Sequence, residues 1–199
     1  AADVSAYGLP AGVDSLEGWL FPATYEFEFG GTAADAISLL VEHQKLALDR
    51  LGVAEADRQR VLTFASIVQK ESGHAEDFGK VARVIQNRLD IGMLLQMDST
   101  AQYGFQQHDD GSVWSTDAAL ADDNPWNTYV HEGLPIGPIA NPGRAAVEAA
   151  LNPEPGDWLF FVAVNLDTGE SVFTTNGADH DAAVQQLNEW CVANPGRGC

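Results

Sequence analysis

The helical spacing of apolar residues in the first half of the chain constrains its fold more than any other feature. Three segments, at about 32–51, 55–72 and 76–91, show this spacing, and a glycine follows each of them. Apolar residues that recur three or four positions apart share one face of a helix, and glycine just beyond the last turn is a common stop signal. The pattern predicts three amphipathic helices, the first with Thr32 and Asp35 as a capping pair.

The middle of the second half is less regular. Residues 104–140 are rich in Gly, Asp, Asn and Pro, which predicts a long loop region. A helix is then expected to begin at Asn141–Pro142 and to end near Leu151, because Asn is a good N-cap and Pro fits the first helical position.

The last part of the chain predicts a β-hairpin and a closing helix. Residues 158–164 and 171–175 are apolar or β-prone and flank the turn-forming stretch NLDTG. A final helix is expected at about 179–192, and Cys191 and Cys199 near its end either form a disulfide or stay free. The predicted fold class is α+β, a mainly helical domain with a C-terminal β-hairpin and a closing helix.

Composition and motifs exclude several classes of function. The chain has 10 Lys and Arg against 29 Asp and Glu, a formal net charge of -19. Such a charge repels phosphate backbones and anionic lipid headgroups, so electrostatic binding of nucleic acid is not expected. The five histidines show no metal-ligand spacing, and HExxH, CxxC, P-loop and GxSxG motifs are missing, so no metal or other cofactor is expected. No apolar run approaches the roughly 20 residues of a membrane span.

The second predicted helix carries an acidic residue on its apolar face. Phe64, Ile67, Val68 and Glu71 fall at positions i, i+3, i+4 and i+7, so Glu71 continues the inward stripe. A carboxyl group that loses water there has a raised pKa, and a protonated acid near neutral pH can protonate a glycosidic oxygen. The alternative is that Glu71 is half-exposed at the helix end and pairs with a cation.

Two further polar clusters follow. Gln96, Asp98 and Thr100 alternate with less polar residues, so they could share one face of an extended segment, or Asp98 could cap a short helix. Asn127 and Tyr129 offer an amide and a hydroxyl beside a flat indole ring, groups that suit a sugar, although a purely structural loop would use the same residues.

Five collinear stretches of sequence carry a resemblance to a known family. They are LEGWLFPATYEF (16–27), ASIVQKES (65–72), VARVIQNRLDIGMLLQMDSTAQYG (81–104), NTYVHEGLPIGPIANPG (127–143) and FFVAVNLDTGESVFTTNGADHDAAV (160–184). Together they resemble the MltG (YceG-like) endolytic murein transglycosylases. The resemblance implies a lytic transglycosylase that cleaves MurNAc–GlcNAc bonds within peptidoglycan strands without water and leaves 1,6-anhydroMurNAc ends.

The resemblance also implies roles for individual residues. Glu71 matches the second Glu of the family's EKE motif and would be the catalytic acid and base, whereas Gln69 stands where the first Glu is usual. His180–Asp181 stands where the family usually has a His-Asn pair, which leaves the role of these two residues open. The residues implied to bind the glycan, with Glu17 supporting the floor of the groove, are Gln96, Asp98, Asn127, Tyr129, Asn141 and Glu17.

The domain organisation is likewise an expectation from the resemblance. Residues 1–13 would be a lead-in from a truncated LysM-like and membrane-anchor region, 14–192 the catalytic domain and 193–199 a C-terminal tail. The full-length protein would be anchored in the cytoplasmic membrane and act on its outer face, with glycan strands and wall-synthesis enzymes as partners. Two alternatives stay open: a hydrolytic muramidase with Asp98 or Glu17 as second carboxylate, and a non-catalytic peptidoglycan-binding module.

Overall fold

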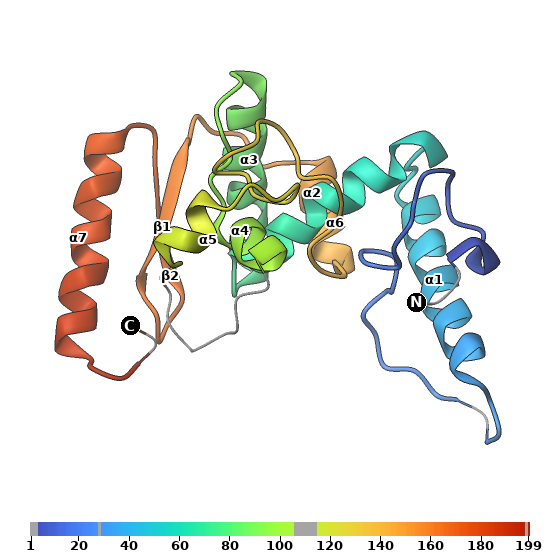
Figure 1. Ribbon diagram of the computed structural model, residues 1–199. Helices are drawn as coiled ribbons and strands as arrows, with labels where there is room; N and C mark the ends of the chain where they lie inside the picture. The colour runs from blue at the N-terminus through green and yellow to red at the C-terminus, as the bar shows by residue number, and fades with distance from the viewer. Residues whose placement is uncertain (1–3, 28, 106–114, 198) are drawn as a thin grey trace.

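The computed structural model describes residues 4–27, 29–105, 115–197 and 199. A β-hairpin and the last helix lie at one end of the molecule, the first long helix lies at the other, and the remaining helices fill the middle (Figure 1). In chain order the elements are η1 (Val4–Tyr7), α1 (Ala33–Arg50), η2 (Glu55–Asp57), α2 (Arg58–Glu71), η3 (Ala75–Asp77), α3 (Phe78–Asp90), α4 (Asp98–Phe105), α5 (Asp117–Ala121), α6 (Arg144–Leu151), β1 (Phe160–Asn165), β2 (Glu170–Thr174) and α7 (Gly177–Ala193). This arrangement confirms the predicted α+β class.

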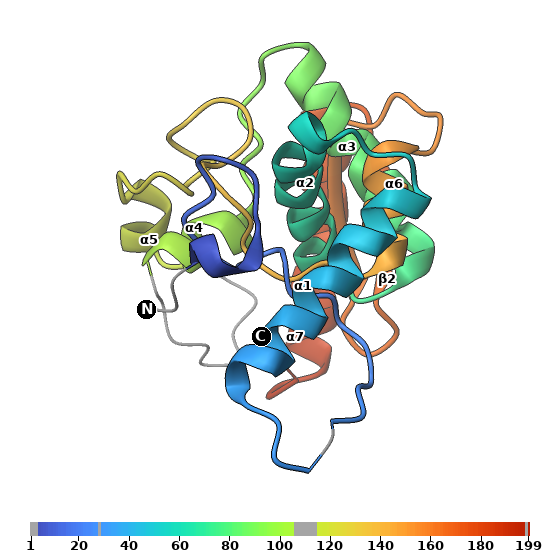
Figure 2. The ribbon, with the colours of Figure 1, turned by 90° about the vertical axis from the view of Figure 1, so that its right-hand side faces the viewer.

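Helix α2 is the centre of the core. Every residue from Val61 to Val68 is buried, because α3, α4 and α6 all pack against this helix (Figure 2). A helix that is enclosed on all sides holds a fixed position, since protein interiors are close-packed. The last residue of α2, Glu71, therefore extends from a helix that is fixed in the core.

Helix α1 has the start and stop signals that its sequence predicts. The Thr32 hydroxyl accepts a hydrogen bond from the Asp35 backbone N–H, and the Asp35 side chain accepts one from the Thr32 N–H, which completes a capping box. At the other end Gly52 has a φ of 71°, a left-handed conformation that glycine adopts without steric cost. The helix is joined to the segment that precedes it, because the Phe21 N–H donates to Leu40 O at 3.2 Å.

The hairpin and α7 form a separate layer. Strands β1 and β2 are antiparallel, with Phe161 opposite Phe173, and α7 packs on β1. A disulfide joins Cys191 to Cys199 and ties the last residue of the chain back to α7. No helix in the described ranges is long and apolar enough to cross a membrane.

Two local predictions differ from the structure. The expected helix start at Asn141 is wrong, because α6 begins at Arg144 with Gly143 as its N-cap. Asn141 uses its amide in contacts with Glu17 and Leu20 instead, so it is not free to cap a helix. The extended reading of residues 96–100 is also wrong, because α4 begins at Asp98 and extends to Phe105; the predicted loop region 104–140 additionally contains the short helix α5.

Candidate active site

A cavity of about 510 Å³ opens beside the end of α2. Its walls come from elements far apart in sequence: the last residue of α2, the segment that leads into α4, the Tyr129 loop, strand β1 and helix α7. Its volume lies in the range of roughly 300–1,000 Å³ that small-molecule sites occupy. The hairpin and α7 thus supply one side of this cavity and the helical core supplies the other (Figure 1).

Glu71 is the acidic group at the core side of the cavity. Its Oε1 atom accepts a hydrogen bond of 2.5 Å from the Ser99 hydroxyl and a weaker one of 3.4 Å from the Ser99 N–H. Oε2 has no hydrogen-bond partner in the part of the chain that the structure describes. The carboxyl group is thereby held by one oxygen, which leaves the other oxygen available to the cavity.

The pKa of Glu71 is raised above its ordinary value of 4.5. Burial is the largest cause, because removal of water penalises the charged form. The nearby Asp98 carboxylate raises the pKa further, whereas the Ser99 hydrogen bonds and the Lys70 ammonium lower it. The direction of this shift is the one expected for a carboxyl on the inward face of α2.

Asp98 and Tyr129 are neighbours in the lining of the cavity. The Tyr129 hydroxyl donates to Asp98 Oδ1, and the Ser115 hydroxyl donates to Asp98 Oδ2 at 2.7 Å. Burial and the bond to Asp98 raise the pKa of Tyr129, so its hydroxyl keeps its proton. Both residues line the cavity beside Glu71, as the sequence predicts.

Gln96 lies at the mouth of the cavity in an unusual backbone conformation. Its φ is 49°, the left-handed region that non-glycine residues rarely enter, and its N–H donates to Thr128 O at 3.0 Å. Beneath it the Thr100 and Thr128 hydroxyls lie 2.7 Å apart and fully buried. Backbone strain of this kind persists where the surroundings determine it, and it concentrates at functional sites.

Asn127 lies behind the wall and not on it. It is fully buried, and its amide nitrogen donates to the carbonyl oxygens of Ala119, Leu120 and Asp122. Its side-chain oxygen accepts from the Tyr129 N–H at 2.9 Å. Asn127 therefore joins α5 to the loop that presents Tyr129 to the cavity.

Glu17 and Asn141 form a second polar cluster that does not line the cavity. Asn141 Nδ2 donates to Glu17 Oε1 at 2.7 Å, and the Leu20 N–H donates to Asn141 Oδ1 at 3.0 Å. Tyr103, on α4, places its hydroxyl 3.5 Å from Glu17 Oε2. Because α4 also carries Ser99, this cluster supports the element that holds Glu71.

Gln69, which replaces the first Glu of the family motif, also points away from the cavity. Its side-chain oxygen accepts from the N–H of Gly143, the N-cap of α6, at 3.0 Å. Gln69 thus fastens α6 to the end of α2, a role for which an acceptor oxygen is sufficient.

Three cavity features are not found by the sequence reasoning. Ser99 binds Glu71, and Phe160 and other β1 residues form an apolar wall. Arg88, only 7% exposed, donates to the carbonyl oxygens of Leu159, Leu94 and Leu95, and its guanidinium lies 5.0 Å from the centre of the Phe160 ring. An available signal was the position of this arginine three residues after Ile85, on the apolar face of α3.

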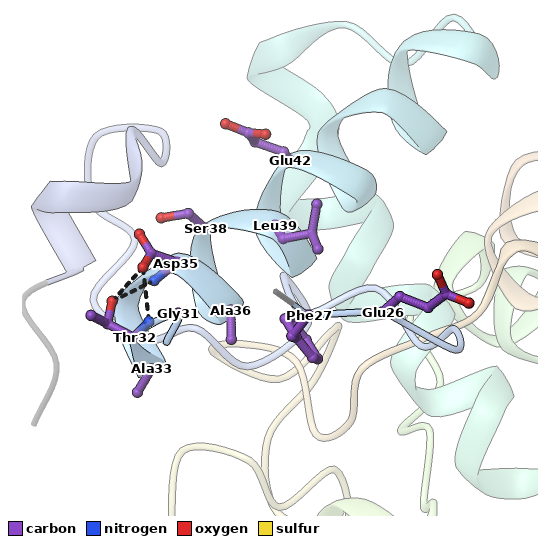
Figure 3. Close-up of a pocket in the computed structure, with 10 residues that line it drawn as sticks. All are labelled: Glu26, Phe27, Gly31, Thr32, Ala33, Asp35, Ala36, Ser38, Leu39 and Glu42. Atoms are coloured by element: carbon purple, nitrogen blue, oxygen red, sulfur yellow. Dashed lines mark hydrogen bonds between the residues drawn. The ribbon is translucent and has the colours of Figure 1, made fainter. Parts of the chain in front are cut away.

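A second hollow, of about 570 Å³, lies on the far side of the molecule against α1 (Figure 3). Phe27 and Leu39 supply apolar surface and Glu26 and Glu42 supply carboxylates. Its Asp35 carboxylate is engaged in the capping box, and hydrogen bonds from Thr32 lower the pKa of Asp35. The pKa of Asp35 is therefore shifted in the direction opposite to that of Glu71.

No group of three or more His, Cys, Asp or Glu residues within the described ranges could hold a metal ion. The chemically distinctive group is the carboxyl of Glu71, which keeps its proton at a higher pH than an ordinary glutamate. An acid with this property can protonate a leaving oxygen, which makes Glu71 the candidate general acid of this α+β protein.

The chain belongs to the YceG-like family, whose model matches residues 3–186. The endolytic murein transglycosylase of Bacillus subtilis (strain 168) is 37% identical over 176 residues, which are 86% of this chain and 48% of that protein. The endolytic murein transglycosylase of Streptococcus pneumoniae serotype 2 is 32% identical over 181 residues, 86% of this chain and 32% of that protein. The chain thus spans about half the length of the first relative and about a third of the second.

A solved structure has the same fold. The 2.6 Å crystal structure of a yceG-like protein from Listeria monocytogenes superposes with a TM-score of 0.77 at 34% identity. The match covers 90% of this chain and 61% of that one. The fold and the family membership are therefore supported by two independent comparisons.

Proposed function

We propose that this protein is a peptidoglycan lytic transglycosylase that cleaves MurNAc–GlcNAc bonds within glycan strands. The observation that carries the proposal is Glu71, a carboxyl with a raised pKa in a cavity of about 510 Å³. The names of the two relatives that share most of this chain support the same substrate and reaction class.

In the first step Glu71 acts as a general acid. Ser99 holds Oε1, so the proton resides on Oε2 and passes to the oxygen between the two sugars as the bond to C1 of the muramic residue breaks. The carboxylate that results is stabilised by the hydrogen bond from the Ser99 hydroxyl, which strengthens as charge develops on Glu71.

In the second step the same carboxylate acts as a base. It takes the proton from the C6 hydroxyl of the muramic residue while that oxygen forms a bond to C1. The C6 hydroxyl belongs to the substrate itself, so its effective concentration at C1 is high and no water or second carboxylate is consumed. The product carries a 1,6-anhydro ring, Glu71 regains its proton, and the reaction requires no cofactor.

The other predicted residues have two kinds of role in this proposal. Gln96, Asp98 and Tyr129 line the cavity and contact the glycan. Asn127, Asn141 and Glu17 support the groove from behind, through hydrogen bonds to the loops and to α4.

The cellular setting follows from the proposed substrate. Peptidoglycan lies outside the cytoplasmic membrane, so the protein acts on the extracytoplasmic side, and we propose that the full-length protein is anchored in that membrane near wall-synthesis enzymes. Residues 1–13 would then be the connection to the preceding LysM-like and anchor region, 14–192 the catalytic domain and 193–199 its tail.

Product analysis separates the proposal from its alternatives. Purified glycan strands are incubated with the protein, and the new chain ends are identified by mass spectrometry. Anhydro ends support the transglycosylase. Reducing ends would instead indicate a muramidase that uses Asp98 or Glu17 as second carboxylate, and binding without cleavage would indicate a peptidoglycan-binding module.

A further inference from the structure

His180 lies on the cavity wall formed by β1 and α7, and the proposed reaction does not use it. Its side chain lines the same cavity as Glu71, and its imidazole stacks on the Phe160 ring at 5.2 Å between ring centres. The Arg88 guanidinium contacts the same phenyl ring, at 5.0 Å. The three side chains Arg88, Phe160 and His180 therefore form one cluster that lines the same cavity as Glu71.

The surroundings keep the His180 imidazole neutral. Burial is the largest cause that lowers the pKa of His180, and the nearby charge of Arg88 lowers it further. The Asp181 carboxylate acts in the opposite direction but is a smaller effect. A neutral imidazole carries a single N–H, so the position of that hydrogen decides what the ring can do.

The two ring nitrogens of His180 are in different environments. Nδ1 is buried and has no hydrogen-bond partner in the described part of the chain, whereas Nε2 is not enclosed in this way. A buried N–H without an acceptor is rarer in proteins than a buried acceptor without a donor. The hydrogen is therefore placed on Nε2, the accessible ring nitrogen of a side chain that lines the cavity.

We propose that the N–H at Nε2 of His180 donates a hydrogen bond to the carbonyl oxygen of an acetamido group of the bound glycan. The part of the cavity lining that β1, the turn after it and α7 supply is largely apolar and includes Phe160, Val162, Leu166 and Val184, of which Phe160 stacks on His180. A sugar hydroxyl placed there would accept from His180 but leave its own O–H without an acceptor. An acetamido group instead offers a carbonyl to the imidazole and a methyl group to the apolar wall.

This inference rests on the proposed function, because it assumes that N-acetylated glycan occupies the cavity. It assigns His180 to substrate binding and not to proton transfer. The contribution of a single neutral hydrogen bond in a water-poor site is expected to be roughly tenfold in affinity.

The test measures binding in the absence of cleavage. Calorimetric titrations with N-acetylated glycan strands use Glu71→Gln protein as the parent, with His180→Phe, His180→Gln and Gln186→Ala added separately. Phe preserves the stack on Phe160 but removes the donor, whereas the Gln amide nitrogen can reach the position of Nε2. Gln186 is exposed on the same helix and serves as the matched control.

The expected result is a roughly tenfold weaker affinity for His180→Phe and an affinity within about twofold of the parent for His180→Gln and Gln186→Ala. With de-N-acetylated strands the His180→Phe change should have no effect. Equal affinities of all variants for N-acetylated strands would overturn the role of His180 and leave the proposed function standing. A loss that persists with de-N-acetylated strands would overturn the acetamido assignment, and no binding by the parent would overturn both proposals.

Discussion

Two hollows of similar size lie among the described residues, one against α1 and one at the end of α2, and each contains a carboxyl group near a helix end. Glu71 is the last residue of α2 and Asp35 is in the first turn of α1. Burial raises the pKa of Glu71, whereas hydrogen bonds from Thr32 lower the pKa of Asp35. The Asp35 carboxylate is exposed, whereas Glu71 is half-buried at the cavity. Each accepts one backbone and one side-chain hydrogen bond on a single oxygen, but the backbone bond is longer at Glu71, 3.4 Å against 2.9 Å at Asp35.

Chemical competence therefore depends on what surrounds a carboxyl and not on the size of the hollow beside it. The α1 hollow is at least as large as the one beside Glu71. Asp35, in the α1 hollow, is ionised near neutral pH and stabilises the start of α1. Glu71, in the α2 hollow, can hold a proton for transfer.

The largest expected effect is on catalysis. Glu71→Gln should lower the rate of glycan cleavage by about 10²- to 10⁴-fold, because the amide cannot donate a proton to the leaving oxygen. Asp35→Asn, the equivalent change in the other hollow, should leave the rate unchanged. Rates are measured on purified glycan strands, and near-normal turnover by Glu71→Gln would end the assignment.

The next effect concerns the partner of Glu71. Ser99→Ala removes the hydroxyl hydrogen bond that favours the charged form and keeps the one from the backbone N–H, so the pKa of Glu71 should rise. The high-pH limb of the kcat/KM profile should then move to higher pH, and the maximal rate should fall roughly tenfold because the proton-bearing oxygen is no longer fixed. Ser38→Ala, the same change in the α1 hollow, is the control; a Ser99→Ala profile identical to wild type would contradict the role of Ser99.

The third effect is on stability as a function of pH. A carboxyl whose pKa is raised by folding binds its proton more tightly in the folded state, so its contribution to stability is lost as pH rises from 4.5 through the folded pKa. Glu71→Gln cannot ionise and should become increasingly stable relative to wild type over that window. Urea unfolding at a series of pH values measures the difference in free energy of unfolding between the two proteins. A difference that stays constant with pH would argue against a raised pKa of Glu71 in the folded state.

The smallest expected effect is a loss of stability when Thr32, the hydrogen-bond partner of Asp35, is changed. Thr32→Ala removes the N-cap of α1 and should lower the free energy of unfolding by about 1 kcal/mol, or roughly 2–4 °C in Tm, with cleavage unaffected. Asp35 has a lowered pKa, so its stabilising effect should be present above 3.8 and fade as pH falls through its folded value. Thermal unfolding of Thr32→Ala and wild type checks the size, and a concurrent loss of activity would show that the two hollows are coupled.

Sequence reasoning predicted the parts of this molecule that depend on local patterns. The helices, their glycine stops, the capping box at Thr32 and the inward position of Glu71 all follow from spacing along one element. The hairpin and closing helix follow in the same way, and α7 differs from the prediction by only two residues at its start and one at its end.

The remainder depends on contacts between distant segments, which local patterns do not encode. Asn141 has a side chain that often caps helices. Here that side chain instead accepts a hydrogen bond from the Leu20 N–H and donates one to Glu17. Asn127 looks like a sugar-binding amide and is instead buried under three carbonyl groups. Arg88 and Phe160 are in contact because α3 packs against β1. The residue pattern of α3 or of β1 alone therefore does not identify this part of the cavity wall.

The most direct test is a measurement of both carboxyl pKa values in one sample. Carbon-13 NMR of the side-chain carboxyls follows Glu71 and Asp35 through a pH titration, with Glu71→Gln and Asp35→Asn used to assign the signals. We predict that Glu71 titrates clearly above 4.5 and Asp35 below 3.8. A Glu71 signal that titrates at or below 4.5 would contradict a proton-holding acid at the end of α2 and, with it, the proposed chemistry.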